Sequence, residues 1–164
     1  GQGFILCTPL QLAVMTSRLV NGGRPVLPRL MKNERAEIQK RKSLQLSPQH
    51  LHTMLKGMDK VVNGFNGTAR KVVDRSMKFQ FGGKSGSVQV KRISLDERES
   101  GKLKNKDRPW HERDHAMFVA FAPLKSPRYV VSVVVEHGGG GSTMAAPIAR
   151  DILAEALRLN PSKL

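Results

Sequence analysis

The 164-residue sequence carries 28 Lys and Arg against 13 Asp and Glu, which gives a formal net charge of +15. Its length suits one domain with its own core, and 39% hydrophobic with 25% charged residues excludes a collagenous, disulfide-rich or wholly disordered chain. The single cysteine excludes an intrachain disulfide, and no apolar run reaches the roughly 20 residues that span a bilayer.

Two helices are predicted in the first half of the chain. Residues 8–21 begin with Thr8 as N-cap and Pro9 at the first helical position, and Asn21-Gly22-Gly23 ends them. Cys7, just before this helix, is typical of a small buried hydrophobe. Ser47-Pro48 opens a second helix to about residue 63 by the same cap-then-proline pattern. The apolar spacing in both helices indicates core packing.

The second half of the chain predicts a sheet and a last helix. Strands are expected at residues 85–90, 115–122 and 128–136, and the short turn at 123–127 pairs the last two as an antiparallel hairpin. Ser142 or Thr143 caps a helix to about residue 159, whose apolar stripe contains Ile148, Ile152, Leu153, Ala156 and Leu157. The predicted fold class is therefore α+β, an antiparallel sheet with flanking helices.

Two basic loops account for much of the charge. Residues 24–42 carry seven basic and two acidic side chains, and residues 91–113 carry eight and five, within loops expected at about 24–46 and 91–113. Such charge leaves open a module that binds nucleic acid or another polyanion. Few aromatic residues are interleaved to stack on bases, so a solvated basic surface is the preferred interpretation and no nucleic-acid partner is expected.

The strongest candidate for a functional segment is Gly82-Gly83-Lys84-Ser85-Gly86-Ser87. Its glycines allow a backbone to approach a ligand closely, and a Lys beside hydroxyl groups can bind a carboxylate. It lacks the Walker spacing of a phosphate loop, and the four glycines at 138–141 indicate a flexible turn. Asp114 and His115 are neighbours that a strand would point to opposite faces. The five histidines show no metal-ligand spacing, so neither a metal nor a cofactor is predicted.

Several segments in series resemble class B penicillin-binding proteins, especially the elongation transpeptidases. The segments are GQGFILCTPLQLA at 1–13, NGTA at 66–69, KSGSVQ at 84–89, DHAMFVAFAP at 114–123 and VVVEHGGGGSTMAAPIARDIL at 133–153. Their order and spacing fit from end to end. The resemblance implies the C-terminal part of a transpeptidase domain, of the penicillin-binding and serine β-lactamase-like fold, over residues 1–164.

The resemblance also implies a reaction and a set of roles. In this family a serine attacks the D-Ala–D-Ala bond of a peptidoglycan stem peptide, an acyl-enzyme forms, and β-lactams acylate the same serine. Lys84 would supply positive charge and bond the serine of the middle motif. Ser85 and Ser87 would hold the substrate carboxylate, with Gly86 leaving room and Gln89 completing the binding strand. The Ser87 backbone N–H would be an oxyanion-hole donor.

The family's other two motifs, S-x-x-K and S-x-N, do not occur in the sequence. In the family both precede the segment that corresponds to residues 1–13, so we expect a truncated domain whose nucleophile lies in a missing N-terminal half. The isolated chain is accordingly predicted to be inactive. The parent would be anchored in the bacterial inner membrane with this domain in the periplasm. A basic polyanion-binding module and an inert structural fragment stay as alternatives.

Overall fold

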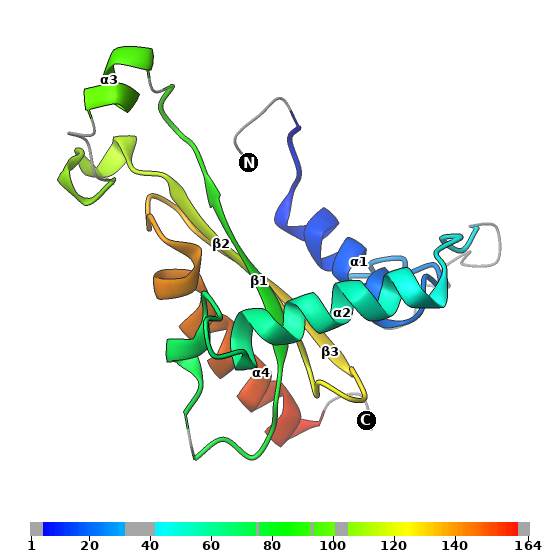
Figure 1. Ribbon diagram of the computed structural model, residues 1–164. Coiled ribbons are helices and arrows are strands. Elements are labelled where there is room, and N and C mark those ends of the chain that lie inside the picture. The colour runs from blue at the N-terminus through cyan, green and yellow to red at the C-terminus, as the bar shows by residue number, and fades with distance from the viewer. Residues whose placement is uncertain (1–4, 32–41, 75, 93, 101–104, 161–164) are drawn as a thin grey trace.

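The computed structural model describes residues 5–31, 42–74, 76–92, 94–100 and 105–160. Its main elements follow the chain as a first helix α1 and a longer helix α2, a strand β1, a short helix α3, a hairpin of β2 and β3, and a last helix α4 (Figure 1). Their bounds are Pro9–Val20, Pro48–Asn63, Gly82–Val88, Leu95–Ser100, His115–Ala122, Tyr129–Val135 and Ala146–Leu159. The α+β class predicted from the sequence is confirmed.

The two N-terminal helices begin where their caps are predicted. The hydroxyl of Thr8 accepts the backbone N–H of Gln11, and the Gln11 side chain accepts the N–H of Thr8, which is a complete capping box. Ser47 caps α2 by accepting the N–H of His50. Pro follows each cap because the first helical position needs no N–H. Both helices are therefore specified locally.

The sheet is antiparallel in the order β1-β2-β3. Gly83 pairs with Ala120, Ser85 with Phe118 and Ser87 with Ala116. Because side chains alternate between the two faces of a sheet, these pairs share one face, and Lys84, Gly86 and Val88 share the other. The first face is buried and carries the hydrophobic core.

Helix α4 covers the buried face of the sheet. Its small residues Ala146 and Ala149 and its larger Leu153 are fully buried, at most 1% exposed, against Phe118 and Val133 of the sheet. The end of α2 and the 3-10 turn Arg70–Val72 (η2) add Val62, Ala69 and Val72 to the same core. On the opposite face, α1 packs against β2 and β3; α2 packs against β1, which it crosses in the view of Figure 1.

For α4 the predicted cap was wrong and the predicted apolar stripe was only partly right. Neither Ser142 nor Thr143 caps it: Gly141–Ala145 forms a π-helical turn (η5), and the Thr143 hydroxyl donates to Gly140 O within that turn. The predicted stripe is correct for Leu153 and Leu157, which pack in the core, but wrong for Ile148 and Ile152, which are 43% and 46% exposed. The alanines allow α4 to lie close to the sheet, so the small side chains face inward.

The first strand differs from its predicted bounds as well. It begins at Gly82 and ends at Val88, where a strand over 85–90 was expected. A Cβ on Gly82 would collide with the ring of Phe121, and one on Gly83 with the ring of Phe118. The glycines are thus strand residues because the aromatic rings of β2 fill the space that their side chains would need.

The chain between β1 and β2 contains more structure than the expected loop. Helix α3 and the 3-10 turns Asn105–Asp107 (η3) and Trp110–Glu112 (η4) lie beyond the ends of these strands (Figure 1). Arg108 is only 7% exposed and pairs with Asp114 at 3.4 Å. This part of the second basic loop is therefore folded against the domain.

Two glycines give a matched test of this packing. A Cβ on Gly141 would collide with the backbone of Gly86 and Met117, whereas one on Gly57, exposed in α2, would meet nothing within 4 Å. We expect Gly141→Ala to lower the free energy of unfolding by about 1–3 kcal/mol through overpacking. Gly57→Ala should raise it by about 0.5–1 kcal/mol through helix propensity. Urea unfolding measures both, and an unchanged midpoint for Gly141→Ala would contradict the close backbone contact.

Candidate functional site

The candidate segment forms the outer strand of the sheet. Lys84, Ser85, Gly86 and Ser87 all lie in β1, and among the described residues no further strand pairs with its second edge. A strand edge offers backbone N–H and C=O groups to an extended peptide. The segment therefore combines an open edge with a lysine and two hydroxyls.

Lys84 is exposed, and its ammonium nitrogen Nζ donates to the backbone oxygen of Ser85 at 2.7 Å. No carboxylate pairs with it in the described ranges. An ammonium group has three hydrogen-bond donors. Lys84 can therefore bind a hydroxyl or carboxylate that reaches the strand.

The hydroxyl of Ser85 lies 3.4 Å from that of Thr68. Thr68 belongs to the segment between α2 and η2, and Ser85 is 17 residues further along the chain. The sequence analysis did not identify Thr68 as a site residue. Its place in the NGTA segment at 66–69 was the only feature of the sequence that pointed to it. The two hydroxyls lie close enough to hydrogen-bond each other, so while that contact persists one of their two protons is left for a carboxylate.

The Ser87 side chain is hydrogen-bonded to another part of the same chain. Its hydroxyl donates to the backbone oxygen of Gly139 at 3.2 Å and is partly buried. Since a serine hydroxyl has one proton, Ser87 can donate to a substrate carboxylate only if it leaves Gly139. The Ser85–Thr68 pair thus has one hydroxyl proton available for a carboxylate, whereas the Ser87 proton is already bonded to Gly139.

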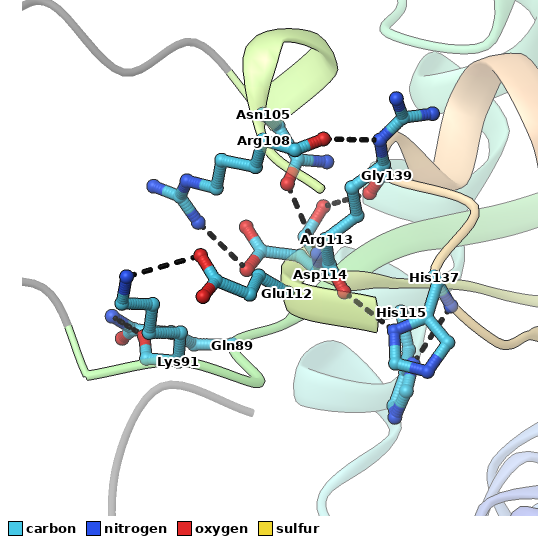
Figure 2. Close-up of polar contacts among 11 residues, drawn as sticks. Gln89, Lys91, Asn105, Arg108, Glu112, Arg113, Asp114, His115, His137 and Gly139 are labelled. Carbon is cyan, nitrogen blue, oxygen red and sulfur yellow. Dashed lines mark hydrogen bonds and ion pairs between the residues drawn. The ribbon is translucent and has the colours of Figure 1, made fainter. Parts of the chain in front are cut away.

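Gln89 lies just beyond the end of β1 and turns toward its own chain. Its side-chain nitrogen Nε2 donates to the backbone oxygen of Lys91 at 2.8 Å, and Lys91 pairs with Glu112 at 3.0 Å (Figure 2). The structure therefore brings together Lys84, Ser85, Gly86 and Ser87 but separates the Gln89 amide from them.

An apolar groove adjoins the same strand. A cavity of about 650 Å³ lies between α1, α2 and the sheet face that carries Lys84, Gly86 and Val88. Apolar side chains of both helices line it, including Leu12, Met15, Leu19, Met54 and Met58. Ile5 and Leu6 at its margin are 80% and 92% exposed.

Cys7 also lines the groove and is exposed, so the expectation of a buried cysteine was wrong. It lies in the extended segment before α1, where no other part of the described chain covers it. An exposed apolar surface of this kind is typical of an interaction site.

Several cations of the second basic loop already have partners within the protein. Lys91 pairs with Glu112, and Arg108 with Asp114, whereas Arg113 donates to the backbone oxygens of Arg108 and Lys106 (Figure 2). These contacts use positive groups that a polyanion would need. The alternative of a polyanion-binding module therefore rests on overall charge alone.

Two classes of site find no support in the described residues. They contain no group of three or more His, Cys, Asp or Glu that could hold a metal ion. Nor does this part of the chain include a helix with the length and apolar character to cross a membrane.

Comparison with known proteins shows extensive similarity over most of the chain. The family model for the penicillin binding protein transpeptidase domain matches residues 1–154. The peptidoglycan D,D-transpeptidase MrdA of Haemophilus influenzae is 39% identical over 161 residues, which cover 93% of this chain and 24% of that protein. The chain thus spans about a quarter of the length of the curated relatives that it matches.

Solved structures show the same relationship. PBP2 of Helicobacter pylori, in its complex with MreC, has a TM-score of 0.71 and 27% identity, covering 97% of this chain and 26% of that one. PBP2 of Pseudomonas aeruginosa, bound to WCK 5153, has a TM-score of 0.64 and 32% identity, covering 97% and 32%. The chain therefore belongs to the penicillin-binding protein transpeptidase domain family, within its class B, PBP2-like members.

Proposed function

We propose that this chain is the C-terminal part of a peptidoglycan D,D-transpeptidase and forms one wall of its active site. The observation that carries the proposal is the strand edge at Lys84–Ser87, unpaired within the described part of the chain, with the Lys84 ammonium on the Ser85 backbone oxygen and the Thr68 and Ser85 hydroxyls 3.4 Å apart. The substrates are peptidoglycan stem peptides, and β-lactams occupy the same site. The name of the Haemophilus influenzae relative, a D,D-transpeptidase, supports this assignment.

The proposed reaction is acyl transfer. A serine hydroxyl attacks the carbonyl of the D-Ala–D-Ala bond, its proton passes to a base, and the terminal D-Ala leaves as an amine. The amine of a neighbouring stem peptide then attacks the acyl-serine and releases the serine, which completes the cross-link. The serine comes from a part of the transpeptidase outside this chain, because S-x-x-K does not occur in the sequence.

We call β1, which carries Lys84 to Ser87, the motif strand. Its candidate residues and Gln89 each have a role in this proposal. The Ser87 backbone N–H stabilises the oxyanion that develops on the attacked carbonyl. Ser85, assisted by Thr68, binds the substrate carboxylate. Lys84 leaves the Ser85 oxygen, bonds the serine of the middle motif and adds positive charge. Gly86 keeps the strand surface clear, and Gln89 reaches substrate only if it leaves the Lys91 oxygen.

The apolar groove is the proposed contact with the nucleophile-bearing part. Ile5, Leu6, Met15 and Met54 are between 44% and 92% exposed, and the groove borders Lys84 and Gly86. Burial of these side chains would release about 25 cal/mol for each Å² removed from water. A segment that filled the groove would reach the motif strand from the side of Lys84. In the parent protein, a membrane anchor would hold this domain in the periplasm.

The first test is covalent labelling by a tagged penicillin. The isolated chain should gain no mass, because it lacks the serine that the drug acylates. A hybrid, in which this chain replaces the matching segment of Haemophilus influenzae MrdA, should be labelled on a peptide outside this chain. Intact-mass and peptide mass spectrometry measure both results.

The controls separate site completion from general reactivity. Heat-denatured hybrid should take no label, since acylation needs the folded site. Label on a serine within this chain would overturn the assignment of the nucleophile. A folded hybrid that takes no label would contradict the proposed function.

The second test concerns Lys84. In the hybrid, Lys84→Ala should slow acylation by about 10²–10³-fold, the effect typical of losing an electrostatic contact to the transition state. Lys56→Ala, at an exposed position of α2, is the matched control and should acylate at the unaltered rate. Stopped-flow measurement with a chromogenic cephalosporin gives the rates. Equal rates for the two variants would remove Lys84 from the proposed mechanism.

A further inference from the structure

A cluster of polar side chains lies beyond the end of the motif strand, on the side where β2 begins and β3 ends. Figure 2 shows how its members face one another across two chain segments, 105–115 and 137–139. We call this cluster the brace. Its members are Asn105, Arg108, Arg113, Asp114, His115, His137 and Gly139.

The brace fixes the peptide of Gly139 from one direction. The N–H of Gly139 donates to the backbone oxygen of Asp114 at 2.7 Å, and the N–H of Asp114 donates to the side chain of Asn105 at 3.0 Å. The carboxylate of Asp114 pairs with the buried Arg108. Gly139 has φ +80°, a left-handed backbone that favours glycine, and a Cβ there would displace the Asn105 amide that bonds Asp114.

His137 fixes the same segment from the other direction. Its backbone N–H donates to Nδ1 of His115 at 2.9 Å, and its own ring Nδ1 lies 3.0 Å from the backbone oxygen of Arg113. These partners define the tautomers, because a carbonyl only accepts: His137 carries its proton on Nδ1, and Nδ1 of His115 carries none. The His137 ring also lies 4.4 Å from that of Trp110 and 4.7 Å from that of His115, centroid to centroid.

The backbone of His137 is itself unusual. Its φ is 55°, a left-handed conformation that is unfavourable for a residue with a side chain. Such a conformation persists where surrounding contacts hold it, and two hydrogen bonds and two rings do so here. The fold thus maintains an unfavourable backbone two residues before the carbonyl that accepts the Ser87 hydroxyl.

We propose that His137 is a positioning residue that sets the place of Ser87 through the Gly139 carbonyl. The inference rests on the proposed function, in which the Ser87 N–H is an oxyanion-hole donor, and assigns to the brace the support of that donor. His137 contacts no substrate: it orients the Gly139 peptide, which anchors Ser87. His115 serves as the acceptor that holds His137.

The isolated chain gives the first readout. In His137→Ala the ring donor is lost, so amide hydrogen exchange of Gly139 should become faster by about tenfold or more through local opening. In His137→Asn, the side-chain NH₂ can still reach Arg113 O, and Asn tolerates the left-handed backbone. At His115 the corresponding variants are His115→Asn, whose side-chain oxygen can still accept the His137 N–H, and His115→Ala, which has no acceptor. Both Asn variants should retain protection.

The tautomers give a signature that loss of stability alone would not produce. Nitrogen-15 NMR of the wild-type chain should show a protonated Nδ1 on His137 and an unprotonated Nδ1 on His115 at neutral pH. The control, His52→Ala, changes an exposed ring of α2 and should leave both signals and the Gly139 exchange rate unaltered. The opposite tautomers in the wild-type chain would overturn the proposal.

The hybrid with Haemophilus influenzae MrdA gives the second readout. There His137→Ala should lower the acylation rate constant by about tenfold or more through displacement of the oxyanion donor. Penicillin affinity before acylation should be nearly unchanged, and His137→Asn should restore most of the rate. A folded His137→Ala hybrid that acylates at the wild-type rate would overturn the positioning role.

The two proposals fail in different ways. If the wild-type hybrid takes no label, the proposed function fails, while exchange in the isolated chain still decides whether His137 fixes Gly139. If His137→Ala does not fold, the Asn variants decide the matter. If an Asn variant folds but its Gly139 amide exchanges rapidly, the proposed role of the brace is contradicted.

Discussion

Close contact between two backbones organises the motif strand. Gly141 lies against the peptide of Gly86 so closely that a Cβ would collide with backbone atoms, which cannot move aside as a side chain can. On the neighbouring strand, the rings of Phe118 and Phe121 occupy the space beside Gly83 and Gly82. Glycine at position 141 lets the π-helical turn meet the sheet backbone directly, and glycine at 82 and 83 leaves room for the two rings. Alanines on α4 continue the same close packing.

Elements that are specified by adjacent residues could be predicted from the sequence, whereas elements that depend on contacts such as this one could not. Helices α1 and α2 are specified by Thr8 and Ser47, each followed by proline, so their starts could be predicted from adjacent residues. The β2–β3 hairpin is specified by two β-prone runs and a short turn. The starts of β1 and α4 depend on partners distant in the sequence. A glycine pair resembles a turn until Phe118 and Phe121 are known to lie beside it.

The candidate site was predictable to a similar extent. The segment from Lys84 to Ser87 stands out by composition and by its resemblance to a family motif. The position of Thr68 beside Ser85, and of Gly139 beside Ser87, follows from contacts across 17 and 52 residues of chain. The four glycines at 138–141 indicate a flexible turn by composition. In the structure Gly139 donates to Asp114, which is itself bonded to Asn105, and the preceding His137 donates to His115.

The two faces of the motif strand differ in how far the chain completes them. On the side of Ser87, hydrogen bonds from Gly139 to Asp114 and onward to Asn105 are made within the chain. On the side of Lys84 lie an exposed ammonium group that bonds the Ser85 carbonyl and a groove of about 650 Å³ with exposed apolar side chains. An oxyanion donor must be rigid before substrate arrives, whereas a lysine that bonds a second motif needs that motif in place. The division between a finished face and an open face therefore agrees with the proposed function, in which a part outside this chain supplies the nucleophile on the side of Lys84.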